Sequence, residues 1–88
     1  VSRDDLYIAD AKKIADQVEY GSTIGSTTTV YYNWVMHSYL IRNHSIFLDH
    51  KKDHEFYLLD KRYDSIPNSK YYTTNSDLHF FELMKVTN

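Results

Sequence analysis

The sequence predicts an α+β fold, in which one N-terminal α-helix packs on a mostly antiparallel β-sheet of five or six strands. Three observations support this prediction. Apolar residues first recur at helical spacing, and after the two glycines the pattern changes to the alternation that is typical of strands. Aromatic residues make up 16% of the chain and include nine Tyr, a residue that favours sheets with one exposed face.

The composition indicates one small domain that spans residues 1–88. The chain has no Cys, which excludes disulfides, thiolate metal sites and cysteine nucleophiles. Its net charge is −2, whereas nucleic-acid binders usually carry a basic field, so the charge argues against direct nucleic-acid binding. No stretch approaches the roughly 18 apolar residues that a membrane-spanning helix needs.

The first element is a helix, which we expect over about residues 3–20. Ser2 and Asp5 form a start similar to a capping box, and Gly21 is a plausible terminator. The apolar face of this helix is rich in Ala and other apolar residues at helical spacing: Tyr7, Ala11, Ile14, Ala15 and Val18.

A flexible connection follows over residues 21–27, which contain both glycines of the chain. The rest, residues 28–86, is predicted to be rich in strands. A charged loop at 49–54 suits a hairpin tip, and 66–69 gives the clearest turn signal. The expected strands are 28–33, 37–42, 45–49, 55–61, 70–73 and 78–83.

The sequence carries no catalytic motif, so we expect no enzyme, no catalytic residue and no cofactor. A Gly-x-Ser-x-Gly elbow is absent, and so is a glycine-rich loop for phosphate. Gly21 and Gly25 are spaced as in Gly-x-x-x-Gly, but Ser26 and Thr27 follow them rather than Lys. A hinge is therefore favoured over a phosphate loop.

The candidate metal ligands are His50 and His54, which would share one face if they lay on a helix. The position of the general-base Glu in a zinc-protease motif is occupied by Lys51, and the segment lies between two expected strands. A solvated loop is therefore favoured over a metal site. The remaining alternative is a pH-sensitive contact, because histidines titrate near neutrality.

Adjacent aromatic residues, such as Tyr31 with Tyr32 and Phe80 with Phe81, must point to opposite faces of a sheet. About half of the aromatic side chains should therefore lie in the core. The other half would lie on an ordinary surface or at a protein interface, where Tyr is favoured. A stacking surface for single-stranded nucleic acid is the less favoured alternative.

Several short segments, in their order along the chain, carry a resemblance to a known family. A helix with the pattern Asp-Leu-x-x-Ala precedes several strand-like segments and a late aromatic segment. The segments are RDDLYIA at 3–9, TVYY at 29–32, HSYLIR at 37–42, LLDKRYDSIP at 58–67 and DLHFF at 77–81. This order resembles the globular part of minor pseudopilins of Gram-positive competence pili and type II secretion systems.

The resemblance implies an extracytoplasmic or cell-surface structural subunit that assembles with other pilin-like subunits into a filament for DNA uptake or protein secretion. The subunit would have no small-molecule substrate, and only an N-terminal hydrophobic helix, absent here, would anchor it in the membrane. The family's cleaved N-terminus with Gly-Phe-Thr-Leu-x-Glu is also absent, and the start at Val1 is compatible with a trimmed segment. The candidate interface residues are Tyr7, Ala11, Ile14, Tyr31, Tyr39 and Tyr71.

The alternative is a small protein-binding module of the cytoplasm, such as an immunity protein, an antitoxin or a phage-encoded inhibitor. Small size, mild acidity, exposed Tyr and the lack of catalytic motifs are typical of that class. The two hypotheses differ in the gene, because only a pseudopilin would be encoded with a hydrophobic helix directly upstream of Val1.

Overall fold

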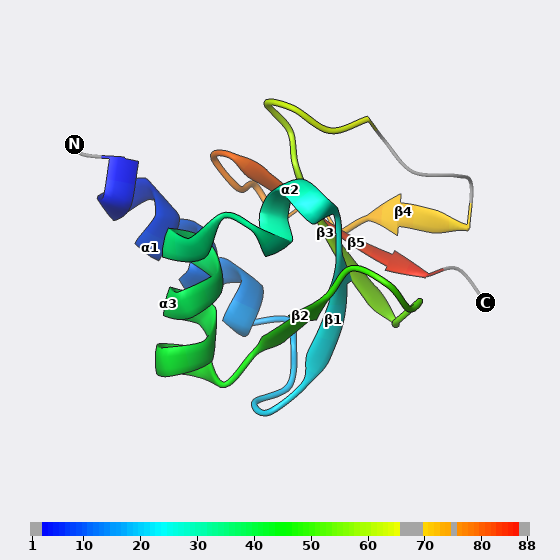
Figure 1. Cartoon of the computed structure of the whole chain (residues 1–88), viewed down its shortest axis with the longest axis horizontal. Helices are drawn as coiled ribbons and strands as arrows, with labels where there is room; N and C mark the ends of the chain where they lie inside the picture. The colour runs from blue at the N-terminus through cyan, green and yellow to red at the C-terminus, as the bar shows by residue number, and fades with distance from the viewer. Residues whose placement is uncertain (1–2, 66–69, 75, 87–88) are drawn as a thin grey trace.

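The fold consists of three helices and a five-stranded mixed sheet (Figure 1). The computed structural model describes residues 3–65, 70–74 and 76–86, and it confirms the α+β class. The helices are α1 (Arg3–Ala15), α2 (Thr28–Tyr31) and α3 (Trp34–His44). The strands are β1 (Thr23–Ser26), β2 (Phe47–Asp49), β3 (Phe56–Asp60), β4 (Tyr71–Thr73) and β5 (Phe81–Val86).

The sheet has the strand order β2-β1-β3-β5-β4 and is half parallel. Strand β1 pairs in parallel with both β2 and β3, whereas β5 pairs antiparallel with β3 and β4. The prediction of a mostly antiparallel sheet is therefore wrong for the β2-β1-β3 half. Helices α2 and α3 form the crossover between β1 and β2 that a parallel pair requires.

The expected flexible connection at 21–27 contains β1, an inner strand of the sheet. Ile24 is fully buried, and Gly25 pairs with Asp49 on one side and Tyr57 on the other. A Cβ at Gly25 would lie 3.2 Å from Cδ1 of Tyr57 and 3.3 Å from the carbonyl oxygen of Phe56. The glycine thus permits close approach of neighbouring chain segments, so it is not a hinge.

The strands expected at 28–33 and 37–42 are helices, because capping residues decide the local structure. The Thr27 side chain accepts a hydrogen bond from the backbone N–H of Val30, and the Asn33 side chain accepts one from Met36. Met36 and Leu40, spaced by four, are buried on the same face of α3. The cap contacts and this spacing outweigh the strand propensity of the aromatic and β-branched residues.

Helix α1 is shorter than the expected helix at 3–20 and ends at Ala15. The backbone N–H groups of Gln17 and Val18 both donate to the carbonyl of Ile14, so turns replace the last part of the helix. Gly21 adopts a φ of 84° in the turn before β1 and does not terminate α1. The predicted capping box depends on Ser2, which lies outside the described residues.

The later strands agree better with the sequence. Strands β2, β3 and β4 correspond to the segments expected at 45–49, 55–61 and 70–73, while β5 lies about three residues after the expected 78–83. The expected hairpin around 49–54 is wrong, because β2 and β3 lie on either side of β1 and do not pair. The turn predicted at 66–69 lies outside the described residues.

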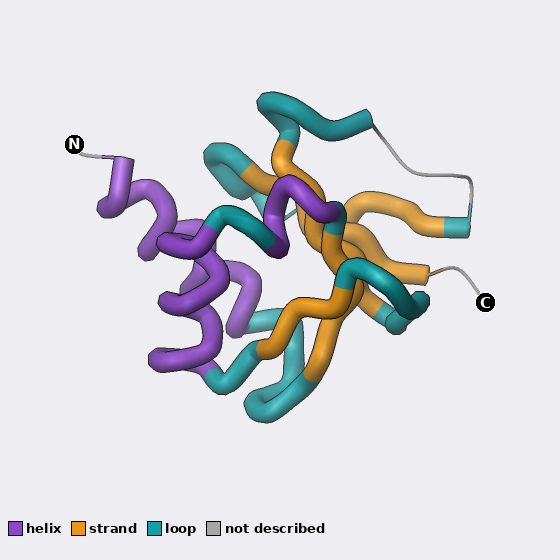
Figure 2. Tube along the Cα trace, in the orientation of Figure 1, coloured by secondary structure: helices purple, strands orange, loops and turns teal. Residues whose placement is uncertain are grey.

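The main core combines side chains from the helices and from one face of the sheet, including Ile14, Leu40, Leu58 and Phe81. Figure 2 shows α1 and α3 together on one side of the strands. A smaller cluster of Leu59, Tyr71 and Met84 belongs to the opposite sheet face. In the part of the chain that the structure describes, no helix has the length and apolar character needed to cross a membrane.

A buried carboxylate connects α1 to the segment before β5. Asp10 is fully buried, and its two oxygens accept hydrogen bonds from the backbone N–H groups of His79, at 2.7 Å, and Phe80, at 2.9 Å. These charge-assisted hydrogen bonds compensate for burial of the carboxylate.

Candidate functional site

Three parallel strands end at one edge of the sheet, and a polar segment follows each of them. Thr27 to Thr29 follow β1, His50 to Lys52 follow β2, and Lys61 to Asp64 follow β3. The carboxyl edge of parallel strands is where open α/β sheets usually bind ligands. We therefore consider this edge the candidate functional site.

The carboxylate of Asp64 joins two of these segments. It accepts hydrogen bonds from the hydroxyl of Thr27, at 2.7 Å, and from the hydroxyl of Thr29, at 2.8 Å. The backbone N–H of Asp60 donates to the same carboxylate at 2.9 Å. Three donors thus satisfy Asp64 and fix the loop after β3 against the start of α2.

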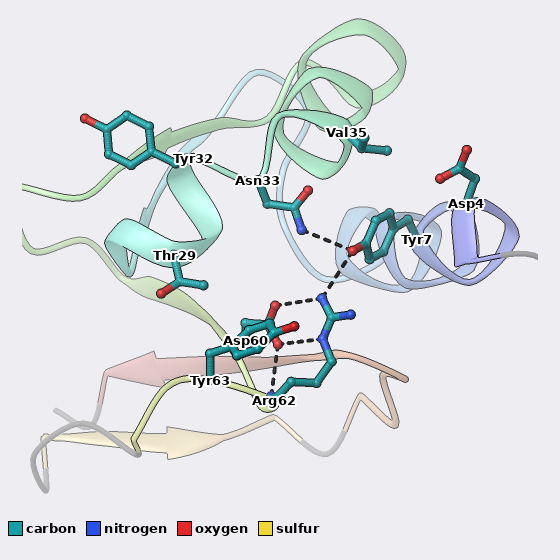
Figure 3. Close-up of a pocket in the computed structure, with 9 residues that line it drawn as sticks. All are labelled: Asp4, Tyr7, Thr29, Tyr32, Asn33, Val35, Asp60, Arg62 and Tyr63. Carbon is teal, nitrogen blue, oxygen red and sulfur yellow. Dashed lines mark hydrogen bonds and ion pairs between the residues drawn. The ribbon is translucent and has the colours of Figure 1, made fainter.

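Asp60 and Arg62 form a charged pair beside this junction (Figure 3). The side chain of Asp60 is only 1% exposed, and Nε and Nη2 of Arg62 bind its two oxygens at 3.0 and 2.8 Å. Nη2 also donates to the hydroxyl of Tyr7 at 3.2 Å. The hydrogen bond with Asp60 is the main cause that raises the pKa of Arg62 above its ordinary value.

Aromatic rings hold the guanidinium of Arg62 from the other sides. Its central carbon lies 4.2 Å from the ring centroid of Phe80 and 5.3 Å from that of Tyr63. The side-chain amide of Asn33 donates to the Tyr7 hydroxyl at 3.4 Å. Side chains from α1, from the α2–α3 junction and from the loop after β3 therefore meet at the Tyr7 hydroxyl (Figure 3).

Arg62 lies in an open concavity of about 430 Å³, which we call the Arg62 concavity. Three of its lining side chains are large and mostly exposed: Tyr32 at 69%, Val35 at 51% and Tyr63 at 72%. In Figure 3 Tyr63 is drawn beside Asp60, whereas the ring of Tyr32 is directed away from Arg62. Exposed Tyr beside Arg is typical of the residues that dominate binding energy at protein interfaces.

Tyr32 also belongs to an aromatic cluster at the junction of α2 and α3, which contains Tyr31, Tyr32, Trp34, His37 and His50. The ring of Tyr31 lies 5.3 Å from Tyr32, 4.8 Å from His37 and 4.5 Å from His50, measured between centroids. The ring of Trp34 lies 5.5 Å from His37 and is mostly exposed. The aromatic cluster and the Arg62 concavity are thus joined through Tyr32.

The structure places the predicted interface residues at several depths. Tyr7, Ala11, Ile14 and Tyr71 are buried and pack internally, whereas Tyr31 and Tyr39 are half-buried against the core. Of these six residues, the structure brings Tyr7 to the Arg62 concavity and Tyr31 to the aromatic cluster. The sequence-based selection missed Tyr32, Trp34, Val35, Arg62 and Tyr63.

The Asn33 cap is a sequence signal for two of these residues, Trp34 and Val35. If Asn33 begins a helix, Trp34 and Val35 occupy its exposed first turn, while Met36, His37 and Leu40 turn inward. Arg62 and Tyr63 have no comparable signal, because their position depends on how the loop after β3 folds back on Asp60.

The two candidate metal ligands have different neighbours. Nε2 of His54 lies 2.9 Å from Oδ2 of Asp49, and His50 contacts the rings of Tyr31 and Tyr32. The hydrogen bond with His54, followed by one from the backbone N–H of Lys51, lowers the pKa of Asp49 from 3.8 to about 2. Within the described residues, no three His, Asp or Glu side chains are grouped to hold a metal ion.

Comparisons with protein-family models, with curated proteins and with solved structures give no match for this chain.

Proposed function

We propose that this chain is a small protein-binding module that contacts its partner through Tyr32, Trp34, Val35 and Tyr63, the four residues that we call the aromatic surface. The observation that carries the proposal is their exposure: each of these side chains is more than half exposed, and Tyr32, Val35 and Tyr63 line the Arg62 concavity. Exposed apolar side chains that adjoin one another mark binding surfaces more often than isolated ones do.

The contacts that hold Arg62 beside this surface support the proposal. Arg62 is held by Asp60, Tyr7 and Phe80, and Asn33 holds the Tyr7 hydroxyl. A side chain that is fixed before binding loses little conformational entropy when the partner arrives, so a preorganised surface binds more tightly. Tyr and Trp add large contact areas at low entropic cost.

The pseudopilin-like filament subunit remains a prediction. Its resemblance was carried by a helix followed by strand-like segments, but residues 29–32 and 37–42 lie at α2 and within α3. We therefore favour the protein-binding module. A hydrophobic helix encoded directly upstream of Val1 would reverse this preference.

The experiment uses Trp34, the one Trp of the chain, as a reporter. Affinity purification from the source cells with the wild-type protein identifies retained proteins, and each is then titrated against the purified chain. Because the Trp34 ring is exposed, we expect its fluorescence emission to shift to shorter wavelength when a genuine partner covers it.

The double variant Tyr32→Ala/Tyr63→Ala keeps this reporter and should weaken binding by at least about 30-fold, which corresponds to about 2 kcal/mol for removal of central interface residues. The matched control is Tyr20→Ala, because Tyr20 is exposed and lies outside the aromatic surface. Equal affinity of the double variant and the control would refute the proposed surface.

A further inference from the structure

The aromatic surface and Arg62 offer hydrogen-bond donors to a ligand. Trp34 is 65% exposed, and its indole N–H, which can only donate, has no partner among the described residues. The Arg62 side chain is 27% exposed, and its Nη1 has no partner in the described part of the chain, whereas its Nε and Nη2 are occupied (Figure 3). Tyr32 and Tyr63, also mostly exposed, add hydroxyls that can donate or accept.

Free acceptors at this surface are fewer. The Asp60 carboxylate is only 1% exposed and is bound by Arg62. The Tyr7 hydroxyl accepts hydrogen bonds from Arg62 and from Asn33. Asp4 is exposed and lines the Arg62 concavity, and no donor among the described residues binds its carboxylate. A ligand with acceptors along its length and one cation near Asp4 therefore complements this surface.

Several modes of peptide recognition fit this surface poorly. A peptide that extends a sheet needs a free edge strand, but the aromatic surface comes from the α2–α3 junction and from the loop after β3, which is an inner strand. An amphipathic helix needs an apolar groove, but Val35 is the one aliphatic residue of the four in this surface. Acidic motifs are bound by clusters of Arg, but buried Asp60 balances the charge of Arg62.

A polyproline II segment matches both the rings and the donors. This helix has no internal hydrogen bonds, so its carbonyl groups are open to a binding partner. Proline has no backbone N–H, so the backbone of a proline-rich segment presents acceptors and no donors. Such segments dock on aromatic side chains, and because they are already extended before binding, they lose little conformational entropy. The surplus of donors and the exposed rings thus favour the same ligand.

We propose that the aromatic surface binds a proline-rich segment of its partner in the polyproline II conformation. This inference rests on the proposed function, because it names the kind of segment that the same surface binds. The indole N–H of Trp34 and Nη1 of Arg62 donate to carbonyl groups of the segment, and the rings of Tyr32 and Tyr63 contact its prolines. A basic residue at one end of the segment pairs with Asp4.

The test is a titration of the ¹⁵N-labelled chain with a synthetic peptide of about ten prolines that ends in Arg, followed by NMR and by Trp fluorescence. The control peptide has the same length and the same terminal Arg, but alternating Gly and Ser replace the prolines, so it is a flexible coil. We expect saturable shifts of the indole N–H of Trp34 and a shift of its emission to shorter wavelength with the proline peptide alone. Saturation with neither peptide, or with both at equal affinity, would overturn the proposal.

Matched variants locate the peptide on the surface. Tyr32→Ala/Tyr63→Ala keeps the Trp34 reporter and should weaken binding of the proline peptide at least tenfold, whereas Tyr20→Ala should not. Equal affinity of these two variants for the peptide would refute the assigned surface.

The role of Asp4 is tested with a second proline peptide, in which Gln replaces the terminal Arg. Asp4→Asn should weaken binding of the Arg peptide about three-fold and leave binding of the Gln peptide unchanged. Equal losses for both peptides would contradict the assigned ion pair.

Failure of this inference differs from failure of the proposed function. A purified partner that needs Tyr32 and Tyr63, together with a proline peptide that does not bind, would refute the polyproline II segment and leave the protein-binding surface supported.

Discussion

At the residue scale, Asp49 links the ionisation of one loop to the stability of the fold. Its pKa of about 2 in the folded chain lies below the ordinary value of 3.8, because His54 and the backbone N–H of Lys51 hold the charged form. A lowered carboxylate pKa stabilises the fold above the unfolded pKa, and this contribution is lost as the pH falls through the folded pKa.

We therefore expect the difference in unfolding free energy between the wild type and Asp49→Asn to be largest near neutral pH. It should shrink as the pH falls from about 4 to about 2. Urea unfolding at several pH values measures this difference, and the ¹³Cγ shift of Asp49 reports its titration directly. A difference that stays constant down to about pH 2 would contradict the assigned contact.

The contact partner of Asp49 could not be predicted from the sequence. The pattern of His50 and His54 suggested a possible shared partner, yet His54 contacts Asp49 and His50 contacts Tyr31. Spacing alone gives no partner in a loop, because the direction of each side chain depends on how the backbone turns. The Asp49–His54 contact depends on a backbone turn that no periodic pattern predicts.

At the scale of elements, two cap residues decide whether residues 28–44 form strands or helices. Asn33 begins α3 by accepting a hydrogen bond from the backbone N–H of Met36 at 3.3 Å. Loss of an N-cap side chain typically costs about 1 kcal/mol. The effect matters here because α3 carries part of the aromatic surface.

We expect Asn33→Ala to lower the unfolding free energy by about 1 kcal/mol, measured by urea denaturation. Asn43→Ala is the matched control, since Asn43 is exposed on the same helix and only donates to the Tyr39 carbonyl. Its expected effect is below about 0.5 kcal/mol. If both variants lose the same free energy, the cap does not stabilise α3 as assigned.

Element types were predictable where burial and local chemistry agreed. The segments Phe56–Asp60 and Tyr71–Thr73 combine strand propensity with an inner position and an edge position in the sheet, respectively, and both are strands. In Thr28–Tyr31 the residues favour a strand, whereas the Thr27 cap favours a helix, and the segment is a helix. In Thr23–Ser26 a glycine obscures the strand signal of an inner strand, because the role of this glycine appears only when Tyr57 packs against it.

At the scale of the whole molecule, one core depends on contacts between distant segments. Ile14 of α1 is fully buried in the cluster that also contains Leu58 of β3 and Phe81 of β5. An unpaired charge in that cluster would lose its hydration without gaining a partner. A domain of this size has a small margin of stability, so one such charge is enough to unfold it.

We therefore expect Ile14→Asp to abolish the folded state at neutral pH, seen as loss of dispersed NMR signals and of cooperative thermal unfolding. Lys12→Asp, on the exposed face of the same helix, should change the unfolding free energy by less than about 0.5 kcal/mol. A folded Ile14→Asp protein would show that α1 is not part of the cooperative core.

The overall topology was less predictable than the core. Helical spacing placed Ala11, Ile14 and Val18 inside, and all three are buried. Parallel pairing of β1 with β2, however, requires the crossover through α2 and α3. Because those two segments were predicted to be strands, neither the crossover nor the parallel pairing could be predicted. The candidate site follows from that crossover, so most of the site could not be predicted either.

The place of β5 in the sheet has a consequence for synthesis of the chain. Phe81–Val86 is the last strand along the described sequence, yet it lies between β3 and β4. On the ribosome, β3 and β4 therefore emerge before the strand that joins them. A chain that is released after Thr73 would lack β5 and would have unpaired strand edges, the kind of surface that invites aggregation and chaperone binding.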